Sequence, residues 1–381
     1  MYKIVFCTPA IYSTGGVERV VSVKANYFAE FLGYDVTIIV TEGEGKQCYF
    51  PLSEKVKVIN FELGFEELWK ASFLKKIFLY LKKQWRYKKL LTAELMRIMP
   101  DITISTLRRE INFLTSINDG SKKVGELHVN RSNYRNFEAA DANIVKRLFA
   151  KIWMWNLTGH LKALDQMVVL TESERLAWSE LSNVSVIPDP LSFPRKECSS
   201  LRRKRVVSIG RYAYQKGVDL LLQAWAKIEK NFPDWELAYY GQGNREPYIQ
   251  QAKDLGIDLH RCHLHDKTTD VQHELLDSSV FVLSSRFEGF GMALVEAMAC
   301  GLPVVSFDCK SGPSEIISDG EDGFLVMPTD VDGLADKLAV LIQDQNMRER
   351  FGKNAYQHSS RYDINDIVQQ WEQLFDKLMR D

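Results

Sequence analysis

The segment FVLSSRFEGFGMALVEAMACGLP, residues 281–303, decides the fold. It begins with FVLSS, whose apolar and β-forming residues are typical of a buried parallel strand. The stretch MALVEAMACG has the pattern of a helix that ends at Gly301, just before Pro303. The segment therefore predicts a strand, a glycine-containing loop and a helix, the repeating unit of a parallel α/β sheet.

Two glutamates bracket the predicted loop and helix. Glu288 lies in the loop, and Glu296 lies roughly two turns into the helix, so the two can lie on the same side of this element. Between them, Gly289, Phe290 and Gly291 place backbone amides at a helix N-terminus, where an anion is favoured. Carboxylates accept hydrogen bonds from hydroxyl groups and amides bind phosphate, so the combination suits a nucleotide-sugar.

Composition limits the class of protein. The chain has 381 residues, of which 45% are hydrophobic and 26% charged, enough to form two ordinary cores. Its 6 cysteines show no CxxC spacing, which argues against a zinc site or a disulfide framework and favours the cytosolic side of the cell. No apolar stretch has the length of a membrane span. Basic residues dominate 1–187 and acidic residues dominate the rest, which indicates two different roles.

The strand and helix pattern begins twice. Residues 3–8 read as a strand, followed by a glycine turn at Gly15 and Gly16, a helix over 17–32 and the strand DVTIIV. This order predicts a doubly wound parallel sheet with its ligand at the carboxyl ends of the strands. The same pattern restarts at RVVSIGR, residues 205–211, so we expect two α/β domains in tandem.

A proline-rich segment separates the two patterns. In SVIPDPLSF, Pro188 and Pro190 stiffen the chain and prevent a helix, as a hinge requires. The sequence therefore predicts a first domain over 1–187 and a second over 188–361. The tail, 362–381, is predicted to be an amphipathic helix whose apolar stripe around Trp371 packs on another surface.

Two cations are predicted near the Glu288 loop. In IGRYAYQKG, Arg211 follows a strand and Lys216 precedes a helix. Both can be solvated loop residues when considered alone. Together with the two glutamates, they can stabilise negative charge on a departing diphosphate, a role that a metal ion plays elsewhere.

Several other residues are weaker candidates. Gly15 and Gly16 allow close approach of a phosphate or a sugar, or form a tight turn only. His128 ends a predicted strand in the first domain, where a sugar contact competes with a purely structural role. The glycines of GQG, with Gly241 first, do not extend into a dinucleotide fingerprint, so a nicotinamide enzyme is not expected. The motif DVD at 330–332 is predicted to cap a helix and not to bind a metal.

Residues 66–91, EELWKASFLKKIFLYLKKQWRYKKLL, form a basic segment rich in aromatic residues. Such a helix can lie on an anionic membrane surface, which we favour. A solvated basic face over buried aromatic residues and a nucleic-acid site are the alternatives, and no recognised nucleic-acid module accompanies the segment. A second element of this kind covers residues 146–164.

With these motifs in order, the chain resembles the retaining nucleotide-sugar glycosyltransferases of family four, which have the GT-B fold. The resemblance spans nearly the whole chain and is strongest from VIPDPL to the segment that ends DGEDGFLV. It is closest to the bacterial branch that builds cell-surface polysaccharides on lipid carriers. The resemblance implies an α/β fold of two tandem Rossmann-like domains, with a C-terminal helix that crosses back to the first domain.

The resemblance also implies residue roles. Arg211 and Lys216 would hold the donor diphosphate, Glu288 would contact the donor sugar and Glu296 the ribose. His128 would touch the donor sugar, and the Gly241 region would border the base. Asp189 stands where the family usually has asparagine. The predicted catalytic group is Glu288, Arg211, Lys216 and His128, and the predicted donor-binding group is Gly15, Gly16, Gly241, Gly289, Phe290, Gly291, Met292, Ala293 and Glu296, with no metal and no cofactor.

The expected activity is retaining transfer of a hexose or N-acetylhexosamine from a UDP-sugar to a hydroxyl of a lipid-linked saccharide. The expected location is the cytoplasm, with peripheral attachment to the inner face of the cell membrane through residues 66–91 and no nucleic-acid partner. A sugar-nucleotide epimerase, a phosphorylase and a non-catalytic membrane-bound assembly subunit are the competing interpretations.

Overall fold

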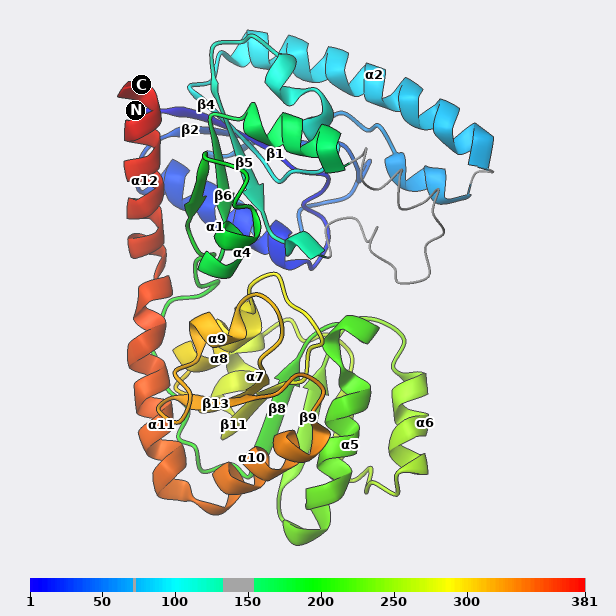
Figure 1. Ribbon diagram of the computed structural model, residues 1–381, viewed down its shortest axis with the longest axis vertical. Coiled ribbons are helices and arrows are strands. Elements are labelled where there is room, and N and C mark those ends of the chain that lie inside the picture. Colours follow the sequence, from blue (N-terminus) through cyan, green and yellow to red (C-terminus); the bar gives the residue numbers. More distant parts are fainter. Residues whose placement is uncertain (71–72, 133–153, 381) are drawn as a thin grey trace. The chain divides into compact units, whose positions relative to one another are not determined.

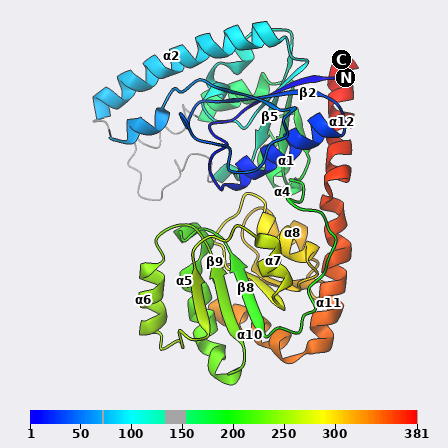
Figure 2. The same cartoon turned by 180° about the vertical axis from the view of Figure 1, so that it is seen from behind.

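The computed structural model describes residues 1–70, 73–132 and 154–380 (Figure 1). The chain divides into two compact units. Unit 1 comprises residues 1–190 together with 367–381, and unit 2 comprises residues 191–366. Each unit is built on one parallel sheet with helices on both faces (Figures 1 and 2).

Unit 1 contains a 7-stranded sheet with the order β3-β2-β1-β4-β5-β6-β7. All of its neighbouring strands pair in parallel. The strand order reverses at β1, which sits between β2 and β4, and this is the point where doubly wound sheets bind ligands. The strands are β1 Lys3–Cys7, β2 Asp35–Val40, β3 Lys57–Asn60, β4 Ile102–Ser105, β5 Lys122–Leu127, β6 Gln166–Val169 and β7 Val184–Val186.

The helices of unit 1 connect these parallel strands. The described helical elements are α1 Gly16–Glu30, η1 Phe65–Lys70, α2 Phe73–Ile98, η2 Glu110–Asn112, η3 Leu114–Ser116 and α4 Glu172–Ala177, and residues 154–162 are also helical. One core cluster lies under α2 and includes Tyr87, Leu91 and Leu95. α2 is therefore anchored to the sheet by one apolar side.

Unit 2 contains a 6-stranded parallel sheet with the order β10-β9-β8-β11-β12-β13. The order reverses at β8, which lies between β9 and β11. The strands are β8 Arg205–Ile209, β9 Glu236–Tyr240, β10 Cys262–His265, β11 Val280–Leu283, β12 Val304–Phe307 and β13 Gly323–Val326.

The helices of unit 2 cover both faces of this sheet, with α5 and α10 packed on one apolar cluster around the buried Trp225. They are α5 Val218–Ile228, α6 Glu246–Asp254, α7 Val271–Leu276, α8 Met292–Ala299, α9 Pro313–Ile316, α10 Val331–Gln343 and α11 Gln345–His358, together with the short turns η5 Tyr214–Lys216, η6 Glu229–Asn231 and η7 Ser359–Tyr362.

The last helix, α12 Ile364–Arg380, leaves unit 2 and joins unit 1 from Ile367 onward. Its apolar stripe is buried, as the pattern around Trp371 predicts. Phe375 packs on Phe28 of α1, with ring centroids 5.7 Å apart. The Tyr2 hydroxyl donates to Asp376 Oδ1 at 2.6 Å. The C-terminal helix is therefore part of the core of unit 1.

The predicted fold class is confirmed: two parallel Rossmann-like units and a C-terminal helix that returns to the first unit. Two strands were not predicted. β7, Val184–Val186, directly precedes the proline segment and is only 3 residues long, and β13, Gly323–Val326, begins with a glycine. Both are edge strands, where a short apolar run suffices. The contact boundary lies after Pro190, a little later than the expected 187/188.

Trp371 is 1% exposed, and its ring lies 5.6 Å from that of Phe375. Trp371→Ala should lower the free energy of unfolding of unit 1 by about 3 to 5 kcal/mol, because it removes a large buried ring and leaves a cavity. Amide hydrogen exchange of α1, measured by mass spectrometry, reports unit 1 separately from unit 2. Gln369→Ala, on the exposed side of the same helix, is the matched control. Equal exchange in both variants would contradict the assigned packing.

Candidate functional site

The predicted site residues lie in both units. Unit 2 holds Arg211, Lys216, Gly241, Glu288, the loop residues 289–293 and Glu296, whereas unit 1 holds Gly15, Gly16 and His128.

In unit 2, the loops that follow β8 and β11 lie side by side, because these two strands are paired. Gly217 has a left-handed backbone with φ of 60°, and a Cβ at this position would lie 2.0 Å from the Ser284 carbonyl oxygen. The Arg286 amide donates to the Gln215 carbonyl oxygen at 2.8 Å. Only glycine fits at position 217, and its small size lets the two loops approach closely.

This approach brings Lys216 to Glu288. Lys216 Nζ donates to Glu288 Oε1 at 2.6 Å, and the Ser285 hydroxyl donates to the same oxygen at 2.6 Å. The side chains of Lys216 and Glu288 are 17% and 6% exposed. A buried carboxylate of this kind requires a charged partner, and the lysine supplies it.

Arg211 lies in the same loop but has a different partner. Its guanidinium is exposed and donates to Gln215 Oε1 at 3.1 Å, and Gln215 Nε2 in turn donates to the Phe287 carbonyl oxygen at 3.0 Å. Gln215 thus joins the cation loop to the glutamate loop. Arg211 is open to solvent at the carboxyl edge of the sheet, where it can reach an anionic ligand.

The loop between Glu288 and α8 is held by close backbone contacts. Phe290 is buried with its ring 5.5 Å from that of Tyr362, and Gly291 starts α8 with φ of 111°. A Cβ at Gly312 would lie 1.6 Å from the Phe290 carbonyl oxygen. These contacts restrict the conformation of the loop.

The start of α8 is suited to an anion. Gly289, Met292 and Ala293 are half-exposed, in contrast to the buried Phe290. The first amides of a helix have no partner within the helix, and the helix dipole favours negative charge beside them. The site thus combines amide donors with the cations Arg211 and Lys216 on neighbouring loops.

The second glutamate, Glu296, lies on α8 and is 4% exposed. It accepts a hydrogen bond from the Ser192 hydroxyl at 2.5 Å. Glu288, in the loop before α8, and Glu296, on α8, therefore contact different partners. Gly241 follows β9, and a Cβ there would lie 2.0 Å from the Gly210 carbonyl oxygen, so this glycine permits close packing of the β8 and β9 ends.

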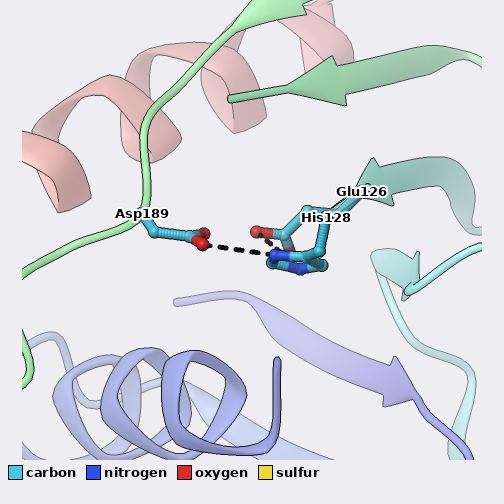
Figure 3. A group of neighbouring side chains, drawn as sticks. All are labelled: Glu126, His128 and Asp189. Atoms are coloured by element: carbon cyan, nitrogen blue, oxygen red, sulfur yellow. Dashed lines mark hydrogen bonds and ion pairs between the residues drawn. The ribbon is translucent and has the colours of Figure 1, made fainter. Parts of the chain in front are cut away.

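In unit 1, His128 lies between two carboxylates (Figure 3). Its Nδ1 is 3.3 Å from Asp189 Oδ2, and its Nε2 is 3.5 Å from Glu126 Oε1. All three side chains are buried, and Lys24 Nζ donates to Glu126 Oε1 from α1. Lys24 Nζ also lies 4.6 Å from the ring centroid of Trp371, so the return helix covers this charge network.

Two cations and two carboxylates share this buried space. Burial disfavours a charged imidazole, but Asp189 and Glu126 outweigh it and raise the pKa of His128 to about 9. Burial likewise opposes ionisation of Glu126, but Lys24 and His128 lower its pKa to about 2. His128 is therefore an imidazolium at neutral pH, and the network is electrically balanced.

The ligand atoms of Glu126, His128 and Asp189 lie within 4.8 Å of one another, a spacing that could suit a metal ion. Lys24 already supplies a positive charge to Glu126, and His128 would have to lose a proton before it could ligate. The residues present thus fit a charge network better than a divalent ion. The predicted absence of a metal stays a prediction.

Gly15 and Gly16 lie at the start of α1. A Cβ at Gly15 would lie 2.1 Å from Glu18 Oε2, and Glu18 Oε1 accepts from the Ser13 hydroxyl at 2.6 Å. A carboxylate over this turn disfavours a phosphate and suits a hydroxyl group. Of the two ligands that the sequence leaves open here, a sugar is the better match.

Some contacts of the site were not predicted from the sequence. Ser285 and Ser192 hold the two glutamates, and Glu126, Asp189 and Lys24 surround His128. The Glu126 contact had a signal, because residues two apart at the end of β5 share one face of the strand. The Ser192, Lys24 and Asp189 contacts join residues far apart in sequence and have no local signal.

Residues 192–358 match the family described as "Glycosyl transferases group 1". The chain is 26% identical to the amylovoran biosynthesis glycosyltransferase AmsD of Erwinia amylovora, over 98% of this chain and 99% of that protein. It is 24% identical, over 98% of both chains, to a Campylobacter jejuni enzyme named as a GalNAc-alpha-(1->4)-GalNAc-alpha-(1->3)-diNAcBac-PP-undecaprenol alpha-1,4-N-acetyl-D-galactosaminyltransferase. Among solved structures, HepE of Anabaena in complex with UDP-glucose has a TM-score of 0.73 at 17% identity, over 99% of this chain and 100% of that one.

The His128 network predicts a pH dependence of stability. The pKa of His128 is raised from 6.5 to about 9, so its stabilising contribution is full below pH 6.5 and is lost as the pH rises through about 9. The free energy of unfolding of unit 1 should fall over this window by at most about 3 kcal/mol. Urea unfolding at a series of pH values, read by hydrogen exchange in β5, measures this loss.

The matched variants are His128→Gln, which should flatten the pH dependence, and His260→Gln, which changes an exposed histidine of unit 2 and should not. If the free energy of unfolding of unit 1 depends on pH in His128→Gln as it does in the unchanged protein, the imidazole is not charged in the folded protein.

Proposed function

We propose, from the premise that residues 192–358 form a group 1 glycosyltransferase domain, that this chain builds a bacterial cell-surface polysaccharide. The reaction is transfer of a hexose or N-acetylhexosamine from a UDP-sugar to a hydroxyl of a lipid-linked saccharide. The anomeric configuration of the sugar is retained.

The observation that carries this proposal is the partly buried Lys216–Glu288 ion pair at 2.6 Å, next to the start of α8. Glu288 can accept hydrogen bonds from donor sugar hydroxyls while Lys216 keeps its charge balanced. The exposed Arg211 and the first amides of α8 supply positive potential for a diphosphate. Unit 2 thus offers a carboxylate for the sugar of the donor, and a cation and backbone amides for its diphosphate.

The proposed chemistry is a front-face displacement. The acceptor oxygen forms a bond to the anomeric carbon while the bond from that carbon to the phosphate oxygen breaks, on the same face of the sugar. The proton of the acceptor passes to the departing diphosphate. Lys216 and Arg211 stabilise the negative charge that grows on this leaving group, so the step needs no protein base.

The other residues take positioning roles in this proposal. Glu296, held by Ser192, binds the ribose hydroxyls of the nucleotide. His128 is proposed to contact the sugar; its Nε2 faces Glu126 Oε1 at 3.5 Å and makes no closer hydrogen bond to a described residue. The Glu18 carboxylate over Gly15 supports a sugar hydroxyl at that turn.

The relatives support the finer parts of the proposal. AmsD is named for the biosynthesis of amylovoran, and the Campylobacter jejuni enzyme is named for a substrate on undecaprenol diphosphate. HepE was solved with UDP-glucose. These names favour a lipid-linked acceptor and a UDP-sugar donor for this chain as well.

An epimerase of the same fold and a non-catalytic assembly subunit remain as alternatives. An epimerase would convert a UDP-sugar without an acceptor, and a non-catalytic subunit would bind UDP without turnover. A screen of isotopically labelled UDP-sugars against a membrane lipid extract, with mass spectrometry of the products, separates the three. Label in a lipid-linked saccharide supports transfer, and its absence with every donor contradicts the proposal.

Glu288→Gln and Lys216→Ala should each lower the rate of sugar transfer by about a hundredfold to a thousandfold, the effect of losing one preorganised electrostatic contact. Lys227→Ala removes a lysine whose partner Asp332 is exposed and should transfer at the rate of the unchanged protein. The measurement is initial-rate UDP release with the donor and acceptor found in the screen. Hydrogen exchange of unit 2 confirms that each variant is folded.

Ser192→Ala should raise the KM for the donor by about tenfold and leave kcat nearly unchanged, because it removes one hydrogen bond that orients Glu296. Glu321→Gln, an exposed change in unit 2, is the control. A fall in kcat without a change in KM would instead place Glu296 in the chemical step.

A further inference from the structure

The first half of α2 carries large apolar side chains that face solvent. Phe78, Leu81 and Trp85 are 70%, 62% and 68% exposed. They are spaced by three and four residues and so form one line along the helix, here called the outer stripe. Both ribbon views show this half of α2 extending past the sheet of unit 1 (Figures 1 and 2).

The outer stripe is not needed by the core. Tyr87, Leu91 and Leu95 anchor α2 from the opposite side and are fully or almost fully buried. The alternative of a solvated basic face over buried aromatic residues therefore applies only in part, because Tyr87 is buried whereas Phe78 and Trp85 are not. The side chains of Trp69 and Phe73 and the residues 146–153 lie outside the described residues.

Cations flank the outer stripe. Lys75, Lys82, Arg86, Lys88 and Lys89 are all exposed. Lys89 Nζ lies 5.7 Å from the ring centroid of Trp85, so charge and aromatic surface are mixed at this point. The acidic residue of α2, Glu94, lies further along the helix and pairs with Arg97. The first half of the helix thus presents an apolar line with a positive border.

This half of α2 belongs to the carboxyl edge of the sheet of unit 1. Lys83 Nζ donates to the Gly64 carbonyl oxygen at 2.7 Å, in the loop after β3. Gln84 Nε2 donates to the Arg109 carbonyl oxygen at 3.2 Å, in the loop after β4. His128, which follows β5, lies at the same edge, because the strands are parallel.

None of the described helices is long and apolar enough to cross a membrane. An amphipathic helix with aromatic side chains and lysines can instead lie within the headgroup region, with its apolar side inserted. A bilayer of anionic lipids matches both parts of the surface, the apolar line and the positive border. An anionic polymer would match only the cations and would leave the outer stripe in water.

We propose that the first half of α2 docks on an anionic lipid bilayer, with the outer stripe inserted and the flanking lysines on lipid phosphates. This docking places the carboxyl edge of unit 1 at the surface where a lipid-linked acceptor resides. The second statement rests on the proposed function, whereas the docking itself does not.

The full-length protein is sedimented with vesicles of equal parts phosphatidylglycerol and phosphatidylcholine, and with vesicles of phosphatidylcholine alone, at about 0.1 M salt. Binding should require the anionic lipid. Lys82→Glu/Lys89→Glu should weaken it by at least roughly tenfold, since each surface lysine contributes about a fivefold factor. Phe78→Ser/Leu81→Ser/Trp85→Ser should also weaken it by at least tenfold with all lysines in place.

Matched controls alter equally exposed residues elsewhere. Lys55→Glu/Lys196→Glu changes two exposed lysines, and Leu176→Ser/Met327→Ser changes two exposed apolar residues. Both should bind vesicles like the unchanged protein. Hydrogen exchange across β3 and β4 verifies that the outer-stripe variants remain folded.

Three outcomes would overturn the proposal. The first is equal binding to both kinds of vesicle, and the second is retention of binding in the outer-stripe variant. The third is complete displacement of the protein from vesicles by sodium polyphosphate, which would show that the surface is only a polyanion site. The readout is independent of turnover. Vesicle binding without sugar transfer would contradict the proposed function and not the docking surface, and transfer to a soluble acceptor without vesicle binding would contradict the docking surface alone.

Discussion

The ion pair between Lys216 and Glu288 is the interaction on which the site of unit 2 depends. The Glu288 carboxylate is 6% exposed, and burial of a charge is costly unless a partner of opposite charge accompanies it. The lysine reaches it only because β8 and β11 are neighbours and because Gly217 lets one loop pass against the Ser284 carbonyl. The ion pair therefore depends on both the strand order of the sheet and the left-handed backbone of Gly217.

Unit 1 meets the same constraint with more groups. Glu126 and Asp189 are buried, and two positive charges accompany them. One is on Lys24, and the other is on the imidazole of His128, whose pKa is raised. Trp371 covers Lys24, so the return helix supplies part of the wall of this network. The C-terminal helix thus does more than complete an apolar core, because it also shields a set of charges from water and so strengthens their attraction.

The sequence predicts those features that follow from local pattern and from topology. Alternation of apolar strands and helices predicts both sheets, and the rule that ligands bind at the carboxyl ends of parallel strands predicts that Lys216 and Glu288 line the same crevice. The pairing of Arg211 was not predictable, because its partner Gln215 is one of several polar residues in a short loop. Ser192 and Asp189 lie near the unit boundary, far in sequence from Glu296 and His128, so only the folded chain reveals these contacts.

The exposure of individual aromatic residues on α2 follows from the fold and could not be predicted from the sequence. Aromatic residues that recur every few positions in a helix can all be buried on one side, or some can be buried and others exposed. Composition does not distinguish these two cases. The fold decides, because Tyr87 takes the inner side and leaves Phe78 and Trp85 on the outer side. A helix that follows a parallel strand must start at the carboxyl edge of the sheet, which is the edge that carries the ligand. The outer stripe occupies the first half of α2, whereas Glu94 and Arg97 pair with each other in the second half. Topology alone therefore places the apolar, basic surface of α2 beside the end of the sheet that bears His128.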